Sequence, residues 1–305
     1  DQSGTRCNGA CARTLLASIV VRMGKASRRK KVQPGRSTYR PPIRFVERPF
    51  DGLPCESDLV AMREIIPCAR MSARTTDGVE FDIVSLLPDG QGAMVRGDGR
   101  IMVGMQTRFH SGDLSHDVGG ALQAALDAKD EGIVAFDVRD PAPRLQELLE
   151  SAEPMELCDD FSFWFDPTEE MSEDIRSTME QTRNELIPTQ EVPGAPGMYW
   201  CEMNRNFVRY VTDEDENKLF TALARMQVAG DAHVGEGSRF VGAFRACGLA
   251  IPVFELAEGV SSDDVSKPAQ NFISKLEDAL NATEALTHDE RRAKQGLVSR
   301  QVTIR

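Results

Sequence analysis

The uneven distribution of charge is the feature that most constrains how this chain can fold. Residues 1–50 contain 12 Lys/Arg against two acids, a charge of +10, whereas the remaining 255 residues contain 24 Lys/Arg against 46 Asp/Glu, a charge of −22. Charge blocks of opposite sign indicate separate parts with separate partners. We therefore expect a basic segment in front of an acidic folded body.

The basic segment is predicted to be a disordered arm. Residues 23–42 read MGKASRRKKVQPGRSTYRPP and show no apolar periodicity, which is typical of chains that cannot bury a core. Residues 1–22 are expected to be a leader that is not native coding sequence, with Met23 as the start. Their apolar stretch, LLASIVV, is too short to span a membrane and lacks the cleavage site of a secretory signal.

The arm carries the one positive functional signal in the sequence. Five cations lie within seven residues, and such a segment can neutralise phosphates without reading a base sequence. We predict that it contacts RNA or the ribosome surface; the alternative is a solvated tail with no dedicated partner. The five cations are Lys25, Arg28, Arg29, Lys30 and Lys31.

The acidic body is predicted to be an α+β protein. Its pattern indicates two tandem mixed α/β modules with mostly antiparallel strands, residues 43–155 and 156–305. Each half shows a hairpin, an acid-headed helix and an apolar strand, so an old duplication and a coincidence of common motifs both remain open.

The expected elements follow from apolar periodicity and from capping and turn residues. Helices are predicted near 54–67, 111–131, 141–150, 168–186, 212–230 (with Thr212 as N-cap), 238–248 and 263–282, with a capping box at Thr287 and Glu290. Strands are predicted near 43–50, 79–87, 93–96, 100–105, 133–138, 198–203, 207–211, 249–256 and 300–304.

The sequence contains no motif that indicates catalysis. There is no P-loop, no nucleophile elbow and no zinc-ligand spacing, so we predict no metal and no cofactor and lean against an enzyme. An enzyme would need a site assembled only in three dimensions, although the same composition suits the capping of a helix. The candidate residues for such a site are His110, Asp113, His116 and Asp117, with Arg239 or Arg245.

The aromatic residues and the cysteines each allow two interpretations. Tyr199, Trp200, Phe207 and Tyr210 could stack on bases if exposed, but alternating hairpin strands usually bury such residues. The seven scattered cysteines indicate reduced, cytoplasmic usage as small apolar residues rather than a disulfide framework.

The leading hypothesis is therefore a cytoplasmic, non-enzymatic binding or adaptor protein, with no membrane association. A further alternative is a partner-binding protein whose acidic body faces a basic protein. An exposed apolar patch rimmed by acids would be its mark.

Several stretches resemble a known family: RPFDGLP, SGDLSHDV, MYWCE, EGSRFVGAFRACGLAIPVFEL and DERRAKQGLVSRQVTIR. They are similar to an actinobacterial family of unknown function whose members are often labelled as preprotein translocase SecA-related. The resemblance implies no activity. That label goes with a cysteine-rich zinc motif, and residues 23–45 contain no cysteine, so neither a structural zinc nor a translocase is expected. The segment SRFVGAFRACGLAIPVFEL also resembles a helix–turn–strand element of SseB-type interaction modules.

Overall fold

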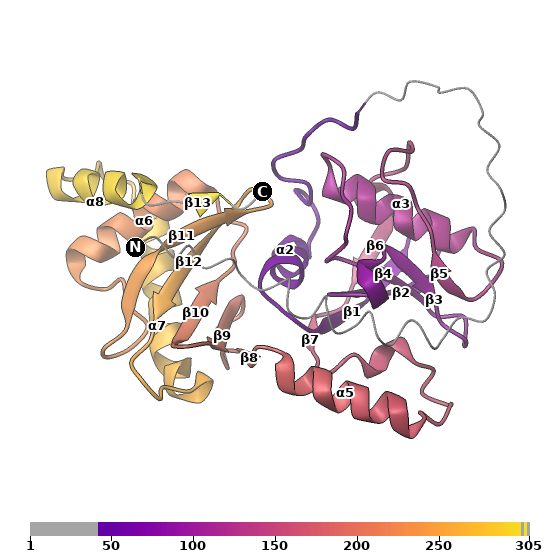
Figure 1. The fold of residues 1–305 in the computed structure, drawn as a ribbon. Helices are drawn as coiled ribbons and strands as arrows, with labels where there is room; N and C mark the ends of the chain where they lie inside the picture. Colours follow the sequence, from indigo (N-terminus) through magenta and orange to yellow (C-terminus); the bar gives the residue numbers. More distant parts are fainter. Residues whose placement is uncertain (1–41, 300–301, 304–305) are drawn as a thin grey trace, which may run out of the picture. The chain divides into compact units, whose positions relative to one another are not determined.

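The chain forms two compact units, each built on one β-sheet (Figure 1). The computed structural model describes residues 42–299 and 302–303. Within these, unit 1 holds residues 42–54 and 66–186, and unit 2 holds the rest. The α+β prediction is confirmed. The boundary between the units lies after residue 186 rather than after residue 155, and helix α2 (Glu56–Glu64) belongs to unit 2.

Unit 1 is a mixed sheet in the order β5-β3-β4-β2-β1-β6, with β7 also paired to β1. All its neighbours are antiparallel except β2 and β4. The turn between β3 and β4 contains Gly99 at φ 82°, as the Asp-Gly pair predicted. The strands are β1 (Ala69–Thr75), β2 (Glu80–Val84), β3 (Ala93–Val95), β4 (Ile101–Gly104), β5 (Gly132–Val134), β6 (Leu149–Ala152) and β7 (Glu156–Leu157).

Both faces of this sheet are covered, which explains why β4 is buried along its whole length. Helix α3 (Leu114–Leu126) contacts β3, β4 and β5. Met102 belongs to a separate apolar cluster with Phe161, Trp164 and Met179. Successive residues of a strand point to opposite faces of the sheet. The cluster around Met102 therefore lies on one face of the sheet, and the side chains of Ile101 and Val103 lie on the other.

The second cluster explains the position of the unit boundary. The aromatic turn η2 (Ser162–Trp164) and helix α5 (Glu173–Glu185) supply its buried residues. The Trp164 Nε1 donates a hydrogen bond to the Leu86 carbonyl at 2.9 Å, which ties this segment to the end of β2. The aromatic residues Phe161, Phe163 and Trp164 therefore belong to the hydrophobic core of unit 1.

Unit 2 is a sheet in the order β13-β11-β12-β10-β9-β8, antiparallel except for the β11–β13 pair at one edge. In unit 1 the parallel pair, β2 and β4, lies inside the sheet. The two sheets therefore have different topologies. The strands of unit 2 are β8 (Thr189–Glu191), β9 (Met198–Glu202), β10 (Asn206–Tyr210), β11 (Arg239–Ala246), β12 (Leu249–Glu255) and β13 (Val302–Thr303).

One face of the unit 2 sheet packs on helices. The apolar core joins Trp200, Val208 and Phe254 of the sheet to buried residues of α6 (Glu216–Ala229) and α7 (Ser262–Asn281), and α8 (His288–Ser299) adds Leu297. The predicted capping box before α8 is present: the Thr287 N–H donates to Glu290 at 2.6 Å.

The largest error of the sequence prediction concerns residues 239–246, which were expected to be helical. They form strand β11, not a helix, so the helix–turn–strand element expected there is wrong. Cys247 and Gly248 both have left-handed φ values, 48° and 81°, and Ala246 pairs with Leu249. This is a two-residue hairpin turn that matches the twist of the strands, and pairing with β12 overrides the helical spacing.

Smaller differences concern strands and caps. No strand forms at 43–50, where Val46 makes one backbone bond to Gly112. Strand β5 is shorter and more exposed than expected, and α4 (Leu145–Leu148) ends where β6 begins. The N-cap of α6 is Asp215, whose carboxylate accepts from the Lys218 N–H. Among the described helices, none combines the length and apolarity that a membrane crossing needs.

Candidate functional site

The predicted His/Asp set lies around the N-terminus of α3, where it caps the helix. The Asp113 carboxylate accepts hydrogen bonds from the backbone N–H groups of Ser115 at 3.0 Å and His116 at 3.4 Å. It also pairs with Arg144, whose Nε lies 2.7 Å away. Asp113 is buried, so these contacts compensate for its lost hydration.

His116 and Asp117 also have hydrogen-bond partners within the protein. The His116 Nδ1 lies 3.1 Å from an Asp117 oxygen, and its Nε2 donates to the Asp140 carbonyl at 2.9 Å. The other Asp117 oxygen accepts from the Ser111 N–H at 2.6 Å. His110 is exposed, and its Nδ1 lies 3.2 Å from the carbonyl oxygen of the neighbouring Ser111. The set therefore supports local structure, and it presents no paired acid and base to a substrate.

The two arginines considered with that set have partners of their own in unit 2. Arg239 donates to Glu255 at 2.7 Å, and Arg245 makes a two-pronged contact with Glu216. Both lie on β11. Neither is available as an unpaired cation for catalysis.

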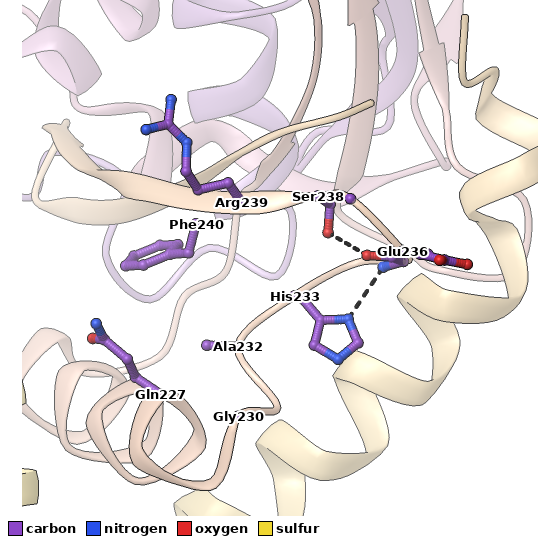
Figure 2. Close-up of a pocket in the computed structure, with 10 residues that line it drawn as sticks. Gln227, Gly230, Ala232, His233, Glu236, Ser238, Arg239 and Phe240 are labelled. Carbon is purple, nitrogen blue, oxygen red and sulfur yellow. Dashed lines mark hydrogen bonds between the residues drawn. The ribbon is translucent and has the colours of Figure 1, made fainter. Parts of the chain in front are cut away.

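The structure also contains an open pocket in unit 2, of about 500 Å³, lined by the loop between α6 and β11 (Figure 2). Ser238 Oγ accepts from the Val234 N–H at 2.9 Å and donates to the Gly235 carbonyl at 2.8 Å. His233 Nδ1 accepts from the Gly235 N–H at 3.4 Å. Figure 2 shows Arg239 extending away from His233. The polar groups hold the loop together, and serine and histidine do not form a nucleophile–base pair.

The most unusual surface of unit 1 is formed by two exposed phenylalanines. Phe45 is 74% exposed and Phe109 is 75% exposed, although large aromatic side chains normally lie inside. Each follows an exposed arginine, and His110 follows Phe109. We call Arg44, Phe45, Arg108, Phe109 and His110 the aromatic patch.

Backbone packing holds the two halves of the aromatic patch together. The Val46 N–H donates to the Gly112 carbonyl at 2.8 Å. A Cβ at Gly112 would lie 2.7 Å from the Ile43 oxygen and 2.8 Å from the Phe45 nitrogen. Such contacts are too short for any side chain, so glycine permits residues 43–45 to lie directly against this loop.

The loop that carries Phe109 is anchored on both sides. The Arg108 N–H donates to the Gly90 carbonyl at 2.9 Å, and the Gln106 side chain donates to the Ile66 carbonyl at 2.9 Å. The bond from Ser111 to Asp117 fixes the other end. The exposed ring therefore stands on a fixed base, which lowers the entropic cost of binding.

The aromatic patch is electropositive. Within the described part of the chain, neither Arg44 nor Arg108 forms an ion pair. Glu47 is the nearby exposed acid of the same segment. The patch begins two residues after Pro42, where the basic arm ends. Residues 25–31, the predicted phosphate-binding cations, lie outside the described residues.

Comparison with family models identifies the chain. It belongs to the family described as Family of unknown function (DUF5926), whose model matches residues 49–305. No curated protein and no solved structure matches it. The DUF5926 match includes Phe109, while Phe45 and the basic arm precede it.

The aromatic residues that the sequence singled out lie elsewhere and are mostly core. Tyr199 is 2% exposed and Trp200 is 7% exposed. Trp200 Nε1 donates to the Val260 carbonyl at 3.0 Å, and burial raises the pKa of Tyr199. Phe207 and Tyr210 are half-buried. The interpretation that these aromatics are core residues is confirmed for the first two, which point to opposite faces of the sheet.

Sequence reasoning missed Phe45 and Phe109, although a signal existed. Each stands in an Arg-Phe pair: Phe109 has no apolar neighbour two residues away, whereas Phe45 lies in the alternation that predicted a strand at 43–50. A third such pair, Arg239-Phe240, shows that the dipeptide alone is not enough, since the Phe240 ring packs 5.3 Å from that of Phe254. Among the described residues, no group of three or more His, Cys, Asp or Glu is placed to hold a metal ion.

Proposed function

We propose that this DUF5926 protein is a non-enzymatic binding protein that contacts single-stranded RNA through its basic arm and the aromatic patch. The observation that carries the proposal is the exposure of Phe45 and Phe109, each directly after an arginine that forms no ion pair with the described residues.

The two parts would supply complementary interactions. The five arm cations, residues 25–31, neutralise phosphates without sequence preference. Exposed aromatic rings stack on unpaired bases, and each stack contributes about 1–3 kcal/mol. Arg44 and Arg108 extend the positive charge of the arm to the rings. Duplex RNA would gain little from the rings, because its bases are already stacked.

The charge of the rest of the chain supports the same choice of partner. Residues 51–305 carry a net charge of −22 and so repel phosphate groups. A nucleic acid would therefore bind at the basic arm and the adjoining aromatic patch. A basic protein partner was expected to need an apolar patch rimmed by acids. Arginines flank the exposed phenylalanines instead, which disfavours that alternative.

An enzyme is disfavoured by the capping network of α3. Asp113, His116 and Asp117 are buried and bonded to backbone groups and to Arg144. Removing any of them should affect stability before it affects chemistry.

The test is fluorescence anisotropy of a labelled oligouridine of about 12 nucleotides, a length within the usual single-strand site size, titrated with the full chain at low and high salt. A variant with all five arm cations replaced by glutamine should flatten the dependence of log K on log salt by up to about 3.5, since each phosphate contact on a single strand contributes about 0.7.

Duplex RNA and single-stranded DNA of equal length serve as competitors. Ile133→Ala, which replaces an exposed apolar residue outside the aromatic patch, serves as the matched control. Equal affinity for duplex and single strand would remove the aromatic patch from the proposal. Absence of salt-dependent binding by the full chain would refute it entirely.

A further inference from the structure

Two cysteines in unit 1 face each other across neighbouring strands. Strands β1 and β7 pair Ala69 with Leu157 and Arg70 with Glu156. The same register places Cys68 opposite Cys158, and the Cys158 N–H donates to the Cys68 carbonyl at 3.0 Å. Directly opposed residues bonded in this way have Cα atoms about 5.5 Å apart, which is within the span of a disulfide.

Each of the two thiols shifts the pKa of the other. The Cys68 Sγ donates a hydrogen bond to the Asp160 carbonyl oxygen at 3.1 Å, and the Cys158 Sγ lies 3.7 Å from the Glu156 carbonyl oxygen. Both cysteines are free thiols in this structure.

The two thiols have opposite electrostatic environments. The neighbouring Cys68 thiol lowers the pKa of Cys158, helped by Arg70 and opposed by burial and Glu156. Burial raises the pKa of Cys68 strongly, and Asp159 and Asp160 add to that rise. Cys158 is half-buried and Cys68 is buried. A reactive thiolate requires a lowered pKa and partial exposure. Among the described cysteines, only Cys158 combines them with a second cysteine directly opposite on the neighbouring strand.

The remaining described cysteines differ. Burial raises the pKa of Cys55 to about 12 and that of Cys247 to about 12, and Cys201 is fully buried. These residues fit the expected role of small apolar side chains.

We propose that Cys68 and Cys158 form a redox-active dithiol that a peroxide oxidises to an intramolecular disulfide. This inference stands on unit 1 alone and does not depend on RNA binding.

The chemistry balances in two steps. The Cys158 thiolate attacks one oxygen of hydrogen peroxide, the O–O bond breaks, and Cys158 sulfenic acid and hydroxide form. The Cys68 sulfur then attacks the Cys158 sulfur, the S–OH bond breaks, and the Cys68 proton joins the departing hydroxide as water. The dithiol loses two electrons to the peroxide, and a thiol reductant reverses the change.

The test is peptide mapping of the full, reduced chain after brief treatment with hydrogen peroxide at neutral pH. Remaining thiols are blocked with N-ethylmaleimide, and trypsin then releases Cys68 in the peptide 64–70 and Cys158 in the peptide 145–176. We expect these two peptides to become disulfide-linked, with the loss of two hydrogens, at least about tenfold faster than Cys55 or Cys247 is modified. Dithiothreitol should restore both thiols.

Two variants separate the roles. Cys68→Ser should leave Cys158 as a sulfenic acid that dimedone traps, and Cys158→Ser should abolish the link while Cys68 stays reduced. Circular dichroism checks that each variant is folded, and Cys201→Ser is the matched control for replacing a buried cysteine. The proposal is overturned if the wild-type peptides remain unlinked while Cys158 is oxidised, or if all described thiols react at one rate.

Discussion

Two pairs of aromatic residues, one in each unit, differ in solvent exposure. Tyr199 and Trp200 lie on strand β9 of unit 2 and are buried on opposite faces of its sheet. Phe45 and Phe109 lie on irregular backbone of unit 1 and are exposed. The comparison teaches that an aromatic residue in a regular strand is drawn into a core on whichever side it points. One held on a packed loop can remain in solvent, where it becomes available for a ligand.

The largest effect should come from breaking the buried pair. Trp200→Ala removes a side chain that belongs to the helix-covered core and donates to Val260. We expect a loss of about 3–5 kcal/mol in the free energy of unfolding, the usual cost of deleting a buried tryptophan, measured by urea denaturation. Phe109→Ala is the control, and a loss there of similar size would show that Phe109 is a core residue and dissolve the contrast.

The exposed pair should affect binding without affecting stability. In Phe45→Ala/Phe109→Ala the unfolding free energy should change by no more than about 0.5 kcal/mol, as for other surface substitutions. RNA binding should weaken by about 1–3 kcal/mol for each lost stack, measured by oligouridine anisotropy. Unchanged RNA affinity with wild-type stability would leave the exposed rings without a role in binding.

The elements that the sequence predicted well are those in which local and tertiary preferences agree. The helix at 114–126 and the hairpin of β9 and β10 were both expected, because their periodicity, caps and turn lengths all indicate the same structure. The strand β11 was missed because its apolar spacing also fits a helix, and only pairing with β12 decides between them.

The candidate site was less accessible from sequence for a different reason. The aromatic patch depends on Gly112 receiving the backbone of residues 43–45, a contact between segments almost 70 positions apart. The cysteine pair depends on the register of β1 and β7, which are neighbours in the sheet but have strands β2 to β6 between them along the chain. The sequence shows which residue types are present, but it does not show which distant residues are in contact in the folded chain.

The smallest predicted effect concerns the charges beside the rings. Arg108→Gln removes one cation that has no ion pair in the described structure, so folding should be unaffected. If Arg108 contacts one phosphate, the slope of log K against log salt should fall by about 0.7, while the contribution of stacking at high salt stays. Arg139→Gln is the matched control, because that exposed arginine is paired with Asp137 and is not part of the aromatic patch. An equal change in slope for both variants would mean that the protein's overall charge steers RNA, and that the aromatic patch contacts it only through its rings.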